Sequence, residues 1–532
     1  MILEFLGADR EVTGSCHYLS FADKHVLIDC GMEQGPDLYV NQEIPVNAAQ
    51  IDYVLITHAH IDHSGLLPLL YSHGFRGDIL ATKATCELCD IMLKDSAHIQ
   101  EFEAEWKNRK GRRAGAQEVT PLYTMEDVLG VMEHFHAVDY DTRLTVCEGL
   151  EARFVDAGHL LGSSSIELWL TEEGETRKLL FSGDIGNGNR PIIRDPKYIE
   201  EADYVIMEST YGNRNHETPP DYAKLLAEVI RDTFTRGGNL VIPAFAVGRT
   251  QEMLYHLRRI KDEKLLPEFP DFEVYIDSPL AVEATNIFHA NVSECFREEA
   301  QELVRKGINP IRFPGLKVAV SPDESRLINS IPTPKVIISA SGMCEAGRVR
   351  HHLKHNLWRP DSTILFVGYQ VEGTLGHSLL NGATKVKLFG EEVEVRAKLV
   401  RFPGISGHAD MDHLLQWIGA VKNPKKVFVV HGEENTAVAF AGMVEGRYGV
   451  PAVAPYTGDT YDLLDGSCIR EGERVHAERH AKSDQPVNTV FGRLVAAGER
   501  LAAIIQKCRG MANKDLGKFA DQITNLCDKW DR

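Results

Sequence analysis

Short apolar runs separated by turns occupy about the first 80 residues of the chain, in HVLIDCG (25–31), YVLITHAH (53–60) and GDILATKAT (77–85). Each run has the length of a β-strand and ends in polar or glycine-containing residues. From Thr82 to about Thr145 the spacing of apolar residues predicts helices. Strands are predicted again in LEARFVDAG, SIELWL, KLLFSGD and YVIMEST, between 150 and 210.

A different pattern begins at about Pro219, where strand-like runs alternate with helical stretches. The strand-like runs are NLVIPAF, FEVYIDSPL, KVIISASGM and TILFVGY, and each precedes a predicted helix. Such alternation implies a mainly parallel sheet covered by helices. The runs KVFVVHG and YTGDTYDL then return to the first pattern. We therefore predict an α/β protein in which a domain over 211–400 is inserted into another, formed by 1–210 and 401–470.

The last segment, 471–532, is predicted to be a helical appendix. Apolar residues recur there at helical spacing, in one run at 490, 494, 497, 501, 504 and 505 and in a second at 516, 519, 520, 523, 526 and 530. Two apolar faces of this kind are costly to leave in water. We expect them to pack on the body or on a second subunit, and we favour a homodimer.

Composition limits the partners of the protein. The formal net charge of −19 over 532 residues argues against a surface coated with basic residues for general nucleic-acid binding. It does not exclude a nuclease, because bound metal ions can dominate the field inside a site. No long apolar run predicts a membrane span, and the segment MILEFLGADREVTGS lacks the pattern of a signal peptide. We expect a cytoplasmic protein without membrane contact.

The strongest chemical motif is the run His58-Ala59-His60-Ile61-Asp62-His63, which directly follows the apolar run YVLIT. Zinc takes about four nitrogen, oxygen or sulfur ligands near 2 Å, and a catalytic site leaves one position for water. Four ligands on one short loop cannot surround a single ion comfortably, but they can be divided between two ions. The alternative is a surface turn rich in His and Asp.

Three more potential ligands stand at the ends of other predicted strands. They are His159 in VDAGHLLGSSS, Asp184 in KLLFSGD and His431 in KVFVVHGE. A lone histidine is most often a structural residue, but three such residues beside an H-x-H-x-D-H motif predict a metal site with two ions. The carboxylate of Asp184 has two oxygens and could bridge them.

These motifs resemble those of the metallo-β-lactamase superfamily, and MESTYG, PAFAVGRTQE, SASGM, GYQVEGTLG and SGHADMDHL in the insert resemble the β-CASP nucleases. The resemblance extends over roughly residues 1–465. It implies an αββα sandwich with the β-CASP domain inserted as a cap, and an RNA-processing motif at the return to the sandwich. The family includes the nuclease subunit of the mRNA cleavage and polyadenylation machinery, its archaeal and bacterial relatives, and RNase J.

The resemblance also assigns roles to residues. It gives His58, His60 and His159 to a first zinc and Asp62, His63 and His431 to a second, with Asp184 between them. Asp29 matches an acidic residue beside the metal pair, as a ligand or as a hydrogen-bond partner. Glu208, His408 and His431 match three β-CASP motifs, and a histidine at the third is typical of RNA-processing members.

Chemistry and resemblance together imply a mechanism. Two zinc ions about 3.5–4 Å apart can share a hydroxide that attacks phosphorus in line. His408, oriented by Glu208, is the candidate general acid for the leaving 3′ oxygen, and Asp62 is counted with them among the catalytic residues. The products would carry a 5′-phosphate and a 3′-hydroxyl.

Glycine-rich turns at strand ends are candidate phosphate-binding sites, because their backbone N–H groups can face an anion. The candidates, for which ordinary turn chemistry is the alternative, are Ser339, Ser341, Gly342, Gly373, Thr374, Ser406 and Arg249.

The main hypothesis is therefore a zinc ribonuclease acting on an RNA substrate. A nuclease for single-stranded DNA or another phosphodiester and an inactive RNA-binding scaffold are the alternatives. The sequence leaves open the endonucleolytic or exonucleolytic mode, the RNA target and the protein partners.

Overall fold

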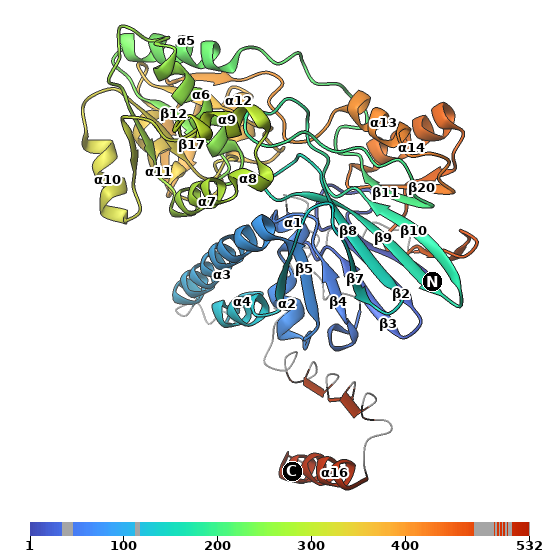
Figure 1. The fold of residues 1–532 in the computed structure, drawn as a ribbon. Coiled ribbons are helices and arrows are strands. Elements are labelled where there is room, and N and C mark those ends of the chain that lie inside the picture. The colour runs from blue at the N-terminus through green and yellow to red at the C-terminus, as the bar shows by residue number, and fades with distance from the viewer. Residues whose placement is uncertain are drawn as a thin grey trace.

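The computed structural model describes residues 1–34, 46–111, 118–472 and 513–530 and a few positions between 494 and 508. Two sheets lie face to face as the centre of a sandwich, and a separate α/β domain lies against one end of it (Figure 1). The predicted αββα sandwich with an inserted α/β domain is confirmed. We call the inserted domain the cap.

The first sheet of the sandwich has eight strands in the order β23-β22-β1-β2-β3-β4-β5-β6. Its strands are β1 Ile2–Gly7, β2 Cys16–Phe21, β3 Lys24–Ile28, β4 Tyr53–Leu55, β5 Asp78–Thr82, β6 Phe135–Val138, β22 Thr460–Asp462 and β23 Cys468–Arg470. The short helices η1 Ala48–Gln50, α1 Ile61–Ser64 and α2 Leu67–Ser72 and the longer α3 Lys83–Gly111 and α4 Met125–Met132 belong to this half.

The second sheet has seven strands in the order β21-β20-β11-β10-β9-β8-β7. Its strands are β7 Arg143–Cys147, β8 Leu150–Asp156, β9 Ser164–Glu172, β10 Glu175–Phe181, β11 Tyr204–Glu208, β20 Lys426–Val430 and β21 Ala452–Val453. Helices α13 Met411–Gly419 and α14 Glu434–Tyr448 cover its outer face, where Trp417 and Phe440 are buried. The inner faces of the two sheets share a core that contains Phe5, Phe154 and Phe181.

The cap contains a six-stranded sheet in the order β14-β13-β15-β12-β16-β19, in which every pair is parallel. The strands are β12 Leu240–Pro243, β13 Glu273–Ile276, β14 Leu316–Val318, β15 Lys335–Ser339, β16 Thr363–Phe366 and β19 Lys398–Arg401, with a hairpin of β17 Lys385–Leu388 and β18 Glu391–Glu394. The cap helices are α5 Tyr222–Thr235, α6 Arg249–Asp262, α7 Pro279–Ala290, α8 Val292–Cys295, α9 Glu298–Arg305, α10 Pro322–Ser330, α11 Val349–Asn356 and α12 Leu375–Leu380.

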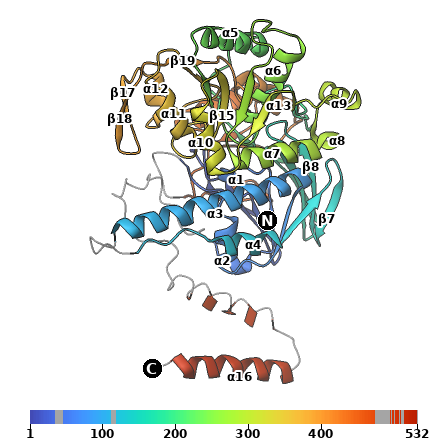
Figure 2. The same ribbon diagram turned by 90° about the vertical axis from the view of Figure 1, so that its left-hand side faces the viewer.

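One apolar cluster continues from the sandwich into the cap. It contains Leu88 of α3, Ala284 and Phe288 of α7, and Ile242 of β12, all buried. Figure 2 shows α3 running along the boundary beside α7. Because close-packed apolar side chains resist displacement, this shared cluster fixes the cap over the end of the sandwich.

The sequence pattern was misleading in one stretch of the sandwich. Helices were predicted from Thr82 to about Thr145, but within this stretch β6 and β7 are strands. Both are short and lie at sheet edges, where the apolar alternation that marks a half-buried strand is weak. The helices α3 and α4 account for the helical spacing before them.

The appendix is described only in part. Of the first predicted apolar run, position 490 lies outside the described residues, whereas Leu494, Ile504 and Ile505 are helical and exposed. Helix α16, Asn513–Trp530, confirms the second helical run. Its Leu526 and Trp530 are exposed, and both views draw it apart from the sandwich and the cap. Among the described residues, no helix is both long and apolar enough to cross a bilayer.

Candidate active site

The predicted ligands converge at the carboxyl ends of strands from both sandwich sheets. His58 follows β4, His159 follows β8, Asp184 follows β10 and His431 follows β20. His60, Asp62 and His63 lie at the start of α1, the short helix that the chain forms directly after His58. Strands that end at one edge of the sandwich therefore bring together residues more than 300 positions apart in sequence.

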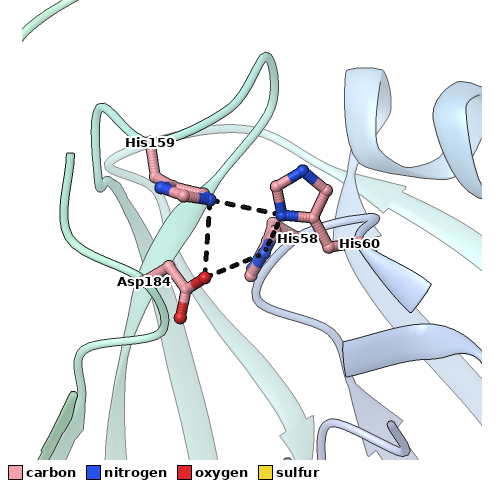
Figure 3. A group of neighbouring side chains, drawn as sticks. All are labelled: His58, His60, His159 and Asp184. Atoms are coloured by element: carbon pink, nitrogen blue, oxygen red, sulfur yellow. Dashed lines mark hydrogen bonds and ion pairs between the residues drawn. The ribbon is translucent and has the colours of Figure 1, made fainter. Parts of the chain in front are cut away.

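Three groups of side chains could hold a metal ion, and in each group the ligand atoms lie within 4.8 Å of one another. One of them, formed by Asp184, Glu208 and His408, is described below, and the other two consist of the predicted ligands. The first is His58, His60, His159 and Asp184, and the second is Asp62, His63 and His431. In the first group His60 Nδ1 is 3.0 Å from His58 Nε2 and 3.2 Å from His159 Nε2 (Figure 3). These nitrogens point at one another, as expected of ligands around a common centre.

Asp184 joins the two groups. Its Oδ2 lies 3.5 Å from His58 Nε2 and 3.4 Å from His159 Nε2, whereas its Oδ1 lies 3.3 Å from His63 Nε2 and 3.6 Å from His431 Nε2. Oδ1 is buried, and its contacts with these imidazoles lack the alignment of a hydrogen bond. A buried carboxylate oxygen without a hydrogen bond is costly, and a cation between it and the imidazoles would remove that cost.

The charge states of the site also fit a metal. Burial lowers the pKa of His58 and His159 well below the usual value and that of His60 to about 4. Despite burial, the surrounding histidines hold the pKa of Asp184 well below its usual range. Neutral imidazoles and an ionised carboxylate are the forms that bind metal, so the first ligand group fits a cation site. In the second group burial opposes a charge on His63, but Asp184 and Asp29 raise its pKa well above the usual value.

Asp29 orients His63. Its Oδ1 accepts from Thr57 N, and its Oδ2 accepts from Thr57 Oγ1 and faces His63 Nδ1 at 2.8 Å. With both oxygens engaged, Asp29 acts as a hydrogen-bond partner in this structure. Carboxylates on the far nitrogen of a metal-binding histidine fix the ring and its tautomer. The hydrogen bonds of Asp29 therefore favour a role as a partner of His63 over direct binding of a metal ion by Asp29.

Glu208 and His408 form a pair at the rim of the ligand groups. Glu208 is at the end of β11, and its Oε1 accepts from Ile185 N at 2.6 Å and faces His408 Nδ1 at 3.2 Å. His408 lies on the chain that returns from the cap, and its Nδ1 is 3.8 Å from Asp184 Oδ2. Burial opposes a charge on His408, but Glu208 and Asp184 raise its pKa to about 9.

Comparison with known proteins places the chain in a family. Residues 9–267 match the model of the metallo-beta-lactamase superfamily, 250–379 match the Beta-Casp domain, and 392–455 match the Zn-dependent metallo-hydrolase RNA specificity domain. The chain is 37% identical to "Ribonuclease TTHA0252" of Thermus thermophilus over 442 residues, which cover 83% of this chain and 95% of the relative. The chain belongs to the β-CASP family.

Other relatives have different printed names. The chain is 32% identical to "Transcription termination factor FttA" of Methanosarcina mazei, with 86% of this chain and 71% of the relative covered. It is also 32% identical to "RNase J-like protein" of Methanocaldococcus jannaschii, with 86% and 99% covered. Membership of the metallo-β-lactamase superfamily and the ligand groups make this β-CASP protein a metal-dependent hydrolase.

The candidate phosphate-binding residues of this β-CASP chain divide into two kinds. The side chains of Ser339 and Arg249 make internal contacts. Ser339 is 1% exposed and its hydroxyl donates to Asp277 O at 2.8 Å. Arg249, whose side chain is 10% exposed, forms an ion pair with Glu252. Phosphate binding at Ser339 and Arg249 stays a prediction.

The remaining candidates lie in turns. Thr374 caps α12 by accepting from His377 N, and Gly373 before it has a φ of 86°. Ser406 Oγ accepts from His408 N at 3.2 Å and so helps to fix the turn that carries His408. Gly342 O accepts from Gln370 Nε2, and Ser341 beside it is half-buried. Phosphate binding by these turns stays a prediction.

Several contributors to the site were missed in the sequence. Thr57 holds Asp29, and Thr210 Oγ1 lies 3.0 Å from His431 Nδ1. Thr57 directly precedes the His58–His63 motif, and Thr210 is part of the MESTYG motif. Their place in these motifs could have identified both residues from the sequence. Arg190 donates to His159 O and to Glu252 Oε1 of the cap, the latter at 2.6 Å. No local pattern marked Arg190, because its partners come from other segments.

Proposed function

We propose that this β-CASP protein is a zinc-dependent ribonuclease that leaves 5′-phosphate and 3′-hydroxyl ends. The observation that carries the proposal is the arrangement of two ligand groups around Asp184 with the His408–Glu208 pair beside them. The similarity to a protein named ribonuclease and to a domain described as an RNA specificity domain supports RNA as the substrate.

The division of ligands supports two zinc ions per chain. His58, His60 and His159 would hold one ion, and Asp62, His63 and His431 the other, with Asp184 between them. Nitrogen-rich sets completed by a carboxylate suit zinc. When bound, two zinc ions would supply Lewis acidity at the phosphoryl oxygens and a water that is deprotonated near neutral pH.

The chain itself supplies the proton for the leaving group. With Nδ1 held by Glu208, His408 has Nε2 free of that contact and can donate from it to the departing 3′ oxygen. The raised pKa of His408 keeps the ring protonated near neutral pH, although zinc on Asp184 would oppose part of this shift. General acid assistance typically contributes about 10²–10⁴-fold.

Glu208 is a positioning residue in this scheme. Besides facing His408, it accepts from the backbone N–H groups of Ile185 and Thr210. These contacts hold the carboxylate in one place, so the imidazole of His408 is oriented before a substrate binds. Preorganised groups of this kind need no rearrangement during reaction.

A comparison of matched oligonucleotides tests the substrate. The purified protein with zinc should cleave a single-stranded RNA much faster than the DNA of the same sequence, and the new ends should be 5′-phosphate and 3′-hydroxyl. Faster turnover of the DNA would favour the alternative of a DNA nuclease. Binding of RNA without cleavage, with zinc far below two per chain, would favour an inactive scaffold.

The mode of cleavage is separable in the same assay. An endonuclease cuts a circular RNA as well as its linear form, whereas an exonuclease needs an end. Comparing the linear, end-labelled RNA with its circular version would therefore decide between the two modes.

A further inference from the structure

Two tyrosines and one arginine follow one another beside His408. Tyr211 has its ring centroid 6.2 Å from that of His408. The Cζ atom of Arg214 lies 4.8 Å from the ring centroid of Tyr211 and 5.9 Å from that of Tyr369. We call Tyr211, Arg214, Tyr369 and Phe245 the aromatic row.

The aromatic row is built by both domains. Tyr211 and Arg214 follow β11 of the sandwich, whereas Phe245 and Tyr369 follow β12 and β16 of the cap. The cap residues thus lie at the carboxyl edge of a parallel sheet, the edge at which open α/β sheets bind ligands. Gly342 lies between the two cap segments of the row. A Cβ at Gly342 would be 3.2 Å from Phe245 Cδ2, and Gly342 O accepts from Nε2 of Gln370, the residue after Tyr369.

Three side chains of the row face solvent, whereas Tyr211 is half-buried. The backbone of the row is held in place. Phe245 is 46% exposed and Tyr369 is 49% exposed. Arg214 is also exposed, and none of the ion pairs among the described residues includes it. Its N donates to Tyr211 O at 3.2 Å, and its O accepts from Met411 N at 3.1 Å. Exposed rings and an exposed guanidinium on a fixed backbone are suited to receive a flat ligand.

Unpaired nucleotide bases are the flat ligands that match this chemistry. Bases stack on the faces of tyrosine and phenylalanine and on guanidinium planes. Stacking also provides attraction that does not depend on the bulk charge, which is unfavourable to RNA at −19. An apolar protein partner would match the rings but would leave Arg214 without a counterpart.

We infer that the aromatic row stacks the unpaired base of the nucleotide whose 3′ oxygen leaves. The inference rests on the proposed ribonuclease function, which puts His408 at that oxygen. Tyr211 is the ring next to His408 and Tyr369 lies beyond Arg214, so the row extends from the proton donor along the 5′ side of the cut.

Tyr369→Ala tests the inference with little risk to the fold, because the side chain is half exposed. The catalytic efficiency, kcat/KM, on a single-stranded RNA should fall by about 5–150-fold, the equivalent of about 1–3 kcal/mol for one stacked base. The loss should lie mainly in KM. Zinc content and the thermal unfolding midpoint should stay unchanged, and Tyr369→Phe, which keeps the ring, should recover most of the loss.

Trp358→Ala is the matched control. Trp358 is 54% exposed and precedes β16, whereas Tyr369 follows it, so the two aromatic residues lie toward opposite edges of the same sheet. This variant should cleave RNA as the wild type does. An equal loss in both variants would show a general effect of altering the cap and would overturn the inference.

A second arm removes the base instead of the ring. RNAs with one abasic nucleotide at successive positions should be cut poorly by the wild type when the missing base lies just 5′ of the mapped cut. Tyr369→Ala should lose little more on that RNA, because ring and base contribute through one contact. If wild type cuts every abasic RNA equally well, or if the two losses simply add, the inference is wrong. If the wild type cuts no RNA at all, the proposed function fails first.

Discussion

The ligand groups and the aromatic row lie close together, but they are built in opposite ways. The ligands are buried, with His58 0% and Asp184 2% exposed. Hydrogen bonds from neighbouring residues fix the imidazole rings, as Asp29 does for His63. In the aromatic row Tyr211 is half-buried and the other three side chains are exposed. The hydrogen bonds that hold Arg214 in place are those of its backbone. A metal needs ligands in place beforehand, whereas a base of variable identity needs a flat, accessible surface.

From this difference we expect substitutions in the two regions to have different effects. Changes among the ligands should remove metal and activity together, because a buried charge would lose its partner. Changes at the rim should leave the metal in place and alter the turnover or the binding of substrate. His408 lies between these regions, since it touches Asp184 on one side and Tyr211 on the other.

The largest effect is expected for Asp184→Asn. The carboxylate would lose its charge and one strong oxygen ligand, so zinc content and RNA cleavage should fall together. A metal ion provides several kcal/mol of charge stabilisation, so we expect a loss above about 10³-fold. Asp23→Asn, at a side chain that is 89% exposed, is the control. Normal zinc and normal rate in Asp184→Asn would remove Asp184 from the site.

His408→Ala should separate proton transfer from metal binding. We expect both zinc ions to remain and RNA to bind nearly as before, while turnover falls by about 10²–10⁴-fold. A nitrophenolate ester, whose leaving group needs no proton, should recover much of that loss. His431→Ala should lose zinc first. Loss of metal in His408→Ala, or equally slow cleavage of the ester, would refute the general-acid role.

Asp29→Asn should have a smaller effect, on affinity alone. The amide could no longer accept from both His63 and Thr57, so the ring of His63 would be less well oriented. Losing such a partner typically costs about 10–100-fold in metal affinity. Competition with a chelator would measure this, and activity should return at saturating zinc. An unchanged affinity would show that Asp29 does not orient the ligand.

The smallest effect on cleavage is expected from removing the appendix. Leu526 and Trp530 of α16 expose 53% and 74% of their surface, and exposed apolar surface costs about 25 cal/mol per Å². We predict that α16 packs in a homodimer, so truncation after residue 480 should lower the mass measured by light scattering. A monomer at every concentration, with or without the appendix, would rule this out.

The grouping of the candidate ligands could be predicted from sequence because His58, His159, Asp184 and His431 come shortly after apolar strands, and His60, Asp62 and His63 lie in the turn and short helix just after His58. Such a strand carries its end residues to the sheet edge whatever the rest of the fold does. Ser339 shows the limit, because its inward direction depends on strand register, which pairing with β12 and β13 fixes. The contact of Arg214 with Tyr369 likewise depends on how the cap sits on the sandwich. No local pattern contains that information.

The zinc content of the purified chain, measured together with RNA cleavage, shows whether bound zinc is required for the reaction. We predict two zinc ions per chain by elemental mass spectrometry, loss of cleavage when a chelator removes them, and recovery when zinc is added back. Full cleavage of RNA by protein that holds no zinc would show that the ligand groups do not form a catalytic zinc site.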